Sequence, residues 1–131
     1  MNPIIHELFN KFRFLSNEAN LTLKTHGLYT SQWSVLNCIK VHEEMSLTQI
    51  WKYLNVEAPT ITRTINRLEE LGWIEVFSGK DRREKIVRLS ERALRDFPDI
   101  KASMTDFEEG INSNITSEEA IILIEILKKI K

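Results

Sequence analysis

The sequence predicts a mainly α-helical fold with one small β-hairpin. Apolar residues recur every three or four positions along most of its 131 residues, which is the periodicity of helices that pack on one face. Residues 73–89 differ, because two short runs of β-forming residues there flank a polar stretch that contains a glycine. The composition, 42% hydrophobic and 28% charged, is typical of a single globular domain over 1–131.

Two helices are expected in the first third of the chain. The first runs from Pro3 to about Lys24, since proline suits a first helical turn, and Gly27 fits a left-handed helix stop. The second has Thr30 as its N-cap. It would direct these apolar side chains toward the core: Trp33, Leu36, Ile39 and Val41.

A pair of short helices separated by a tight turn follows. Ser46 and Gln49 form a capping-box pattern that begins the first of them, and Asn55 begins the turn. The second runs from about Pro59 to Leu71 and ends at Gly72. Two such helices form a helix-turn-helix, whose second helix can enter the major groove of DNA. Its polar face carries the residues that we expect to contact DNA: Thr60, Thr62, Arg63, Asn66 and Arg67.

Residues 73–77 and 86–89 predict the two strands of the hairpin. The tip between them carries too many charges to be buried, and a basic hairpin directly after a helix-turn-helix is typical of a DNA-binding wing. The charged tip residues assigned to DNA contact are Asp81, Arg82, Arg83 and Lys85. Asp81 would form the turn, position the arginines, or do both.

Each of these features also has a purely structural interpretation. Arg63 and Arg67 would pair with Glu69 or Glu70 on an ordinary solvated helix face, and charged hairpin tips commonly only prevent edge-to-edge association. The order of the elements favours DNA contact, because guanidinium groups bind guanine edges and phosphates and are attracted to narrow minor grooves. A winged helix that serves only as a protein-interaction module stays open as the alternative.

The C-terminal third predicts two more helices. Ser90 can cap the first, which Pro98 should kink or divide. Thr116 and Glu119 form a capping box before the last helix, which is apolar nearly all round. A helix with apolar side chains on nearly all sides has to be buried against other protein surfaces. We therefore expect the helices of 1–26 and 90–131 to build a homodimer around a winged helix-turn-helix lobe at 28–89, although the terminal helices could instead bury each other within one monomer.

The charge distribution agrees with a DNA-binding middle segment. The formal net charge is only −1, but residues 60–95 carry nine basic and six acidic side chains, whereas residues 96–131 carry four basic and eight acidic ones. A neutral total therefore conceals a basic segment and an acidic one, as expected when a single face meets phosphates.

Other classes of function find little support. The single cysteine, Cys38, forms no internal disulfide and is expected to be a buried, inert thiol, with redox sensing as the less favoured role. The three histidines are scattered, so no metal is expected, and only His42 beside Glu43 or Glu44 would suit one. No catalytic or cofactor-binding motif and no membrane span is present, which predicts a cytoplasmic protein that is not an enzyme and needs no cofactor.

Across nearly its whole length the chain resembles the MarR (multiple antibiotic resistance regulator) family of winged-helix repressors. The similarity is carried by Ser46–Ile50 with Leu54 and Val56, by Thr60–Arg63, by Arg67–Ile74 and by Asp81–Arg83. The resemblance implies a homodimer with intertwined terminal helices, groove-facing residues from Thr60 to Arg67, and a wing arginine at Arg83 that Asp81 orients. It also implies a repressor that releases DNA on binding a small aromatic or lipophilic molecule, or on oxidation of a cysteine.

Three positions depart from the family pattern and bear on the effector site and the dimer frame. Ala93 stands where the family usually has glycine, Trp51 stands where it has a small residue, and Pro98 interrupts a helix that is normally continuous. Aromatic side chains that would line an effector pocket, or equally well pack in the core, are Phe9, Phe12, Tyr29, Trp33 and Trp51.

Overall fold

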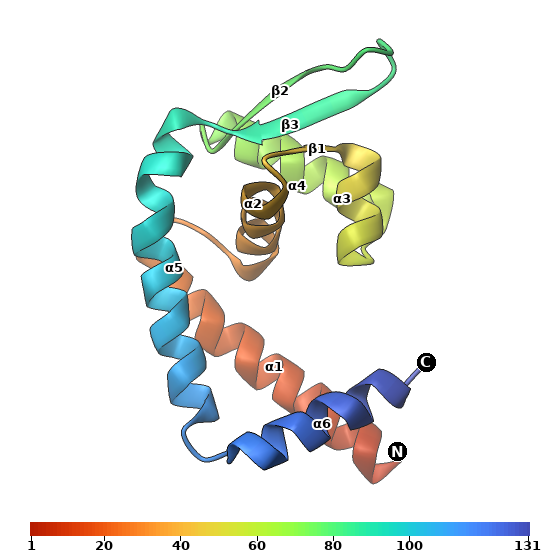
Figure 1. Cartoon of the computed structure of the whole chain (residues 1–131), viewed down its shortest axis with the longest axis vertical. Helices are drawn as coiled ribbons and strands as arrows, with labels where there is room; N and C mark the ends of the chain where they lie inside the picture. The colour runs from red at the N-terminus through yellow and green to blue at the C-terminus, as the bar shows by residue number, and fades with distance from the viewer.

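The computed structural model describes residues 1–131 as six helices and a three-stranded antiparallel sheet (Figure 1). In chain order the elements are α1 (Pro3–Lys24), α2 (Thr30–His42), β1 (Glu44–Ser46), α3 (Leu47–Leu54), α4 (Ala58–Glu70), β2 (Ile74–Ser78), β3 (Lys85–Leu89), α5 (Glu91–Asn112) and α6 (Ser117–Lys129). The elements from α2 to β3 form a lobe at one end, and α5 leads from it to α1 and α6 at the other (Figure 1). No helix is both long and apolar enough to cross a bilayer.

The two capping boxes predicted from the sequence are confirmed. At the start of α3 the Ser46 hydroxyl accepts from the Gln49 N–H at 3.1 Å, and the Gln49 side chain accepts from the Ser46 N–H at 2.9 Å. Thr116 and Glu119 make the same reciprocal pair at the start of α6. The bonds that Glu119 accepts from the Thr116 backbone and hydroxyl stabilise its carboxylate and lower its pKa.

The start of α2 differs by one residue from the prediction, because Thr30 is the first helical residue and Tyr29 is the N-cap. Tyr29 has no suitable capping oxygen, so neighbouring side chains satisfy the free N–H groups. The Gln32 side chain accepts from the Tyr29 N–H at 2.9 Å, and Asn20 of α1 accepts from the Thr30 N–H at 2.8 Å. The first turn of α2 is thereby tied to α1.

Strand β1 was not predicted from the sequence. The strand has three residues, too few to show an alternating pattern. It pairs with β3, with Met45 opposite Val87, and gives the sheet the order β1-β3-β2. The chain enters it through Glu43, whose φ of 67° ends α2 sharply. The hairpin therefore has a third strand at its base.

The main core lies inside the lobe and continues along α5. Trp33, Leu36 and Ile39 are buried as predicted, but Val41 is 66% exposed, so the prediction that it faces inward is wrong. Two residues along a helix correspond to a rotation of about 200°, and Val41 therefore faces away from the side that Ile39 buries.

Pro98 does not divide the helix that contains it, so the break predicted there is wrong. Helix α5 continues unbroken from Glu91 to Asn112 with Pro98 inside. Proline removes only one helical N–H, which would have bonded to the carbonyl of Leu94. Burial of Phe97 and Ile100 on either side holds the helix together, and the Phe97 ring stacks on Trp33 at 5.0 Å.

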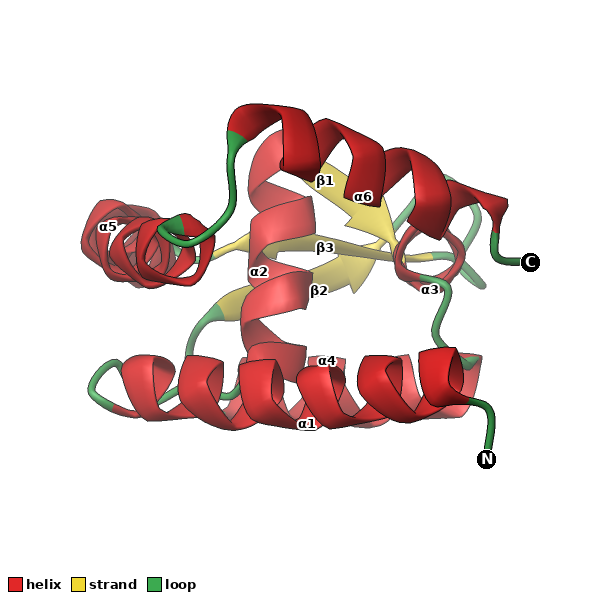
Figure 2. Ribbon diagram, turned by 90° about the horizontal axis from the view of Figure 1, so that it is seen from below, coloured by secondary structure: helices red, strands yellow, loops and turns green.

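Helix α6 has no buried residue in the isolated chain. The exposed large apolar side chains of this helix and of the residue after it are Ile121, Ile122, Leu123, Ile124, Ile126, Leu127 and Ile130. Helices α1 and α6 cross in Figure 1, but the perpendicular view of Figure 2 separates them. The alternative in which the two terminal helices bury each other within one monomer is therefore wrong.

Candidate nucleic-acid interface

Helix α4 packs one face into the lobe and leaves the opposite face open. Ile61, Ile65 and Leu68 are at most 3% exposed. Most of the side chains predicted to contact DNA are exposed on the other side, namely Thr62, Arg63, Asn66 and Arg67. Thr60 is half-buried at the edge of this face. The predicted polar face of the helix is thus confirmed as a surface, while its contact with DNA stays a prediction.

Hydrogen bonds along this face are weak or local. Arg63 donates to the Thr60 hydroxyl at 3.3 Å, and Thr62 donates to the carbonyl of Ala58 at 3.0 Å within the helix. Arg67 pairs with Glu70 at 3.1 Å, with both side chains more than half exposed. Exposed pairs of this kind are worth about 0–1 kcal/mol, so Arg67 can exchange Glu70 for a base or a phosphate at little cost.

The wing projects from the lobe as a two-stranded hairpin (Figure 1). The strands pair in register from Ile74 opposite Leu89 to Ser78 opposite Lys85, which leaves residues 79–84 as the tip. The Asp81 carboxylate accepts the backbone N–H of Arg83 at 3.0 Å. Asp81 therefore acts as a turn former, and it orients Arg83 through the backbone with no ion pair between the two side chains.

The basic side chains at the tip of the wing and at the adjoining end of β3 have no acidic partner within the chain. All four ion pairs of the structure involve other arginines: Arg67, Arg88, Arg92 and Arg95. Arg82, Arg83 and Lys85 are exposed and unpaired, and so is Arg63 on α4. Unpaired cations are available to replace the counterions of a phosphate backbone without first breaking a contact.

Side chains from the start of α5 cap the end of α4. Arg92 donates to the carbonyl of Leu71 at 2.7 Å, and its guanidinium lies 4.3 Å from the centre of the Trp73 ring. Ser90 donates to the carbonyl of Gly72 at 2.7 Å and also caps α5. These bonds satisfy free carbonyls at the negative end of the helix dipole. They attach α4 to α5, a link that sequence periodicity could not reveal.

A cavity of about 700 Å³ lies where α1, α2 and α5 meet. Only one of the five aromatic side chains proposed for an effector pocket, Phe12, lines it. Trp33 is buried in the core, Phe9 is exposed on α1, and Tyr29 and Trp51 line separate surface hollows. Sequence reasoning missed the rest of the lining because it comes from positions that are far apart in the chain.

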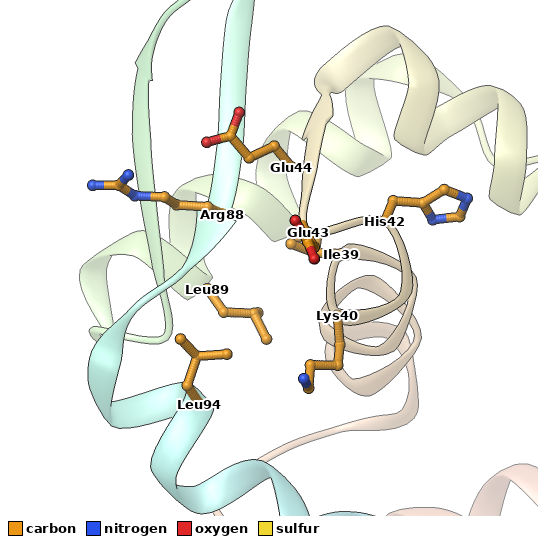
Figure 3. A pocket seen from close by; sticks show the side chains of 8 residues that line it. All are labelled: Ile39, Lys40, His42, Glu43, Glu44, Arg88, Leu89 and Leu94. Atoms are coloured by element: carbon orange, nitrogen blue, oxygen red, sulfur yellow. The ribbon is translucent and has the colours of Figure 1, made fainter.

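A second hollow, between the end of α2, strand β3 and α5, contains the one place that the sequence suggested for a metal (Figure 3). The His42 ring points away from Glu43 and Glu44 there. It bonds instead to the carbonyl of Cys38 at 2.8 Å and lies edge-on to Tyr53. Nowhere in the chain do three His, Cys, Asp or Glu side chains come together as metal ligands would.

Cys38 is buried, with 3% of its surface exposed, and its thiol donates to the carbonyl of Val35 at 3.2 Å. Burial raises the pKa of the Cys38 thiol to about 11. The thiolate is the reactive form, so about one molecule in a thousand carries it at pH 8. Both properties oppose a role in redox sensing.

The native protein is therefore expected to react with a disulfide reagent at pH 8 at least about 1,000-fold more slowly than the protein unfolded in urea, since a stably folded chain exposes its core rarely. The thiolate that the reagent releases can be followed by its absorbance. Cys38 is the only cysteine, so the whole signal reports on it. Similar rates in the two states would contradict the buried, protonated thiol.

Comparisons with known proteins agree with this architecture. Residues 28–85 match the MarR family model. The chain is 44% identical over 116 residues to the HTH-type transcriptional regulator YwoH of Bacillus subtilis, covering 88% of this chain and 85% of YwoH. Its fold is similar to that of a MarR variant from Escherichia coli in complex with operator DNA, with a TM-score of 0.92 at 22% identity over 98% of this chain and 94% of MarR. AbfR bound to DNA gives a TM-score of 0.81 at 22% identity, over 98% and 89%. The chain therefore belongs to the MarR family and is a winged-helix, DNA-binding transcriptional regulator.

Proposed function

We propose that this protein is a homodimeric repressor that binds an inverted-repeat operator and releases it when a small molecule binds. The observation that carries the proposal is the presence, in the same lobe, of an exposed polar face on α4 and of unpaired basic side chains at the tip of the wing. In this arrangement Thr60, Thr62, Arg63, Asn66 and Arg67 read bases or hold phosphates in the major groove. Arg82, Arg83 and Lys85 hold the minor groove and its phosphates, and Asp81 shapes the tip.

The exposed apolar surface of α6 supports the dimer. Six large apolar side chains on one short helix, with Ile130 directly after it, form a patch that a monomer rarely leaves in water. Each side chain of this kind gains roughly 1.5–3 kcal/mol on full burial, so a partner copy is strongly favoured. In this proposal residues 1–26 and 90–131 form the dimer frame, and residues 28–89 form the reading lobe. The frame sets the distance between two lobes, and so the spacing of the half-sites.

The cavity between α1, α2 and α5 supports a small-molecule signal. It is lined by frame residues and by Thr30, Ser31, Ser34 and Val56 of the lobe. Three of these, Ser31, Ser34 and Val56, also line a smaller cavity of about 140 Å³ that reaches Thr60 and Thr64 in the first two turns of α4. A ligand in the larger cavity thus touches residues that support the reading helix, and can change the position of that helix relative to the frame. The buried Cys38 favours this signal over an oxidative one.

Selection of bound sequences from a random DNA library tests the proposal. The wild-type protein is expected to enrich an inverted repeat, and Arg67→Ala is expected to lose preference at one symmetric base pair, at about 1–3 kcal/mol per half-site. Asn66→Ala should weaken the base preference at a neighbouring position of the operator. Gel-shift titrations with the selected operator and with single-base variants measure both effects. Enrichment of no motif, or the same motif in every variant, would rule out base reading by α4 and favour a protein-interaction module.

A further inference from the structure

The lining of the cavity between α1, α2 and α5 specifies the charge of its occupant. We propose that this cavity binds a lipophilic ammonium ion, that is, a protonated amine attached to an aromatic or alicyclic body. The inference rests on the proposed effector role of the cavity and adds the chemical class of the effector.

The walls of the cavity are apolar and partly aromatic. Phe12 from α1 and Phe107 from α5 line it together with Leu15, Ala19 and Ile111. Its volume of about 700 Å³ lies within the usual range for small-molecule sites. Rings such as those of Phe12 and Phe107 bind flat apolar bodies, and their faces attract cations.

The only charged side chain in the lining is acidic. Glu108 contributes a carboxylate, and no Lys, Arg or His lines the cavity. An aryl carboxylate would lose part of its hydration there, find no counter-ion and meet a like charge, all of which oppose binding. An ammonium group would find an ion-pair partner at the rim and aromatic faces inside.

One hydroxyl of the cavity, that of Ser34, also suits a donor. Ser34 uses its proton to bond to the carbonyl of Thr30 at 2.9 Å, so the lone pairs of its oxygen stay available. The N–H of Thr30 is already bound to Asn20 at 2.8 Å. An ammonium ion carries donors only, and therefore matches the Ser34 oxygen and the Glu108 carboxylate better than an acceptor-rich ligand does.

Three probes of nearly equal size and different charge test the proposal: 1-naphthylmethylammonium, 1-naphthylmethanol and 1-naphthoate. Their binding to the wild-type protein is measured by equilibrium dialysis at low salt. The ammonium is expected to bind about tenfold more tightly than the alcohol, because an exposed ion pair and a cation–π contact each add a few-fold. The naphthoate should bind most weakly.

Glu108→Gln is expected to remove the advantage of the ammonium and leave the affinity for the alcohol unchanged. Glu109→Gln is the matched control, since Glu109 is exposed on the same helix but does not line the cavity. It should keep the full preference for the ammonium.

Operator binding by the same preparations distinguishes the ways in which the proposal can fail. Equal affinity for the three probes, tightest binding of naphthoate, or an ammonium preference that survives Glu108→Gln overturns the ammonium proposal and leaves the cavity as an effector site. No binding of any probe to protein that still binds its operator overturns both the ammonium proposal and the effector part of the proposed function. Loss of operator binding in the wild type would instead contradict the proposed DNA-binding function.

Discussion

Ile122→Glu combined with Ile126→Glu is expected to convert the protein into a monomer of 15.4 kDa. The two side chains are 54% and 51% exposed and lie one turn apart on α6, so carboxylates there cost little in an isolated chain. In a dimer interface they would bury two charges per subunit without partners, which is strongly unfavourable. Light scattering coupled to gel filtration measures the mass.

The affinity of this double variant for the full operator should fall by at least about 100-fold, because two linked lobes bind with an avidity that one lobe lacks. Affinity for an isolated half-site should stay within about twofold, since α4 and the wing are distant from α6. Glu125→Gln, on the same helix, is the control and should stay dimeric. A double variant that keeps the dimer mass, with its helical circular dichroism intact, would show that α6 is not the interface.

Arg83→Ala is expected to weaken operator binding by about 30- to 100-fold, whatever the base sequence beneath the wing. The Arg83 side chain is exposed and free of any carboxylate, so its loss removes one cationic contact in each half of the complex. Phosphate contacts of this kind act through counterion release. The slope of log affinity against log salt should therefore fall by about two in a dimer. Anisotropy titrations at several salt concentrations measure both quantities.

Arg95→Ala is the matched control for the wing prediction. Arg95 is also an exposed arginine, with 73% of its side chain accessible, but it lies on α5, pairs with Asp96 at 3.6 Å, and is not among the residues proposed to contact DNA. The Arg95→Ala substitution changes the net charge as much as Arg83→Ala does, and it should alter the affinity for the operator only slightly. If the two variants behave alike, Arg83 only keeps the hairpin tip solvated.

Elements with a strong local signal were predicted closely from the sequence. Ser46, Thr116 and Gly27 each mark a helix end through chemistry that acts over three or four residues, and the structure has those ends in place. The polar face of α4 likewise followed from helical periodicity, since the spacing of Ile61, Ile65 and Leu68 fixes the buried side.

The features that the sequence did not predict depend on contacts between distant segments. Strand β1 exists because β3 offers it a partner some 40 residues later, and three residues carry no pattern of their own. Helix α5 survives Pro98 because Phe97 packs against Trp33 of α2. The cavity between α1, α2 and α5 combines Phe12 with Phe107, which no local rule would join. Local propensity is a weak guide wherever tertiary packing decides.

The in-register strands of the wing have a consequence for how such regulators diversify. The ladder ends at Ser78 opposite Lys85, and the tip closes on itself through the bond from the Gly79 N–H to the carbonyl of Glu84 at 2.8 Å. Insertions or deletions between these two residues leave the ladder and the core beneath it untouched. If the wing enters the minor groove as proposed, its reach can therefore change from one descendant to another while α4 keeps the base preference proposed for it. The two proposed parts of operator recognition are then free to evolve at different rates.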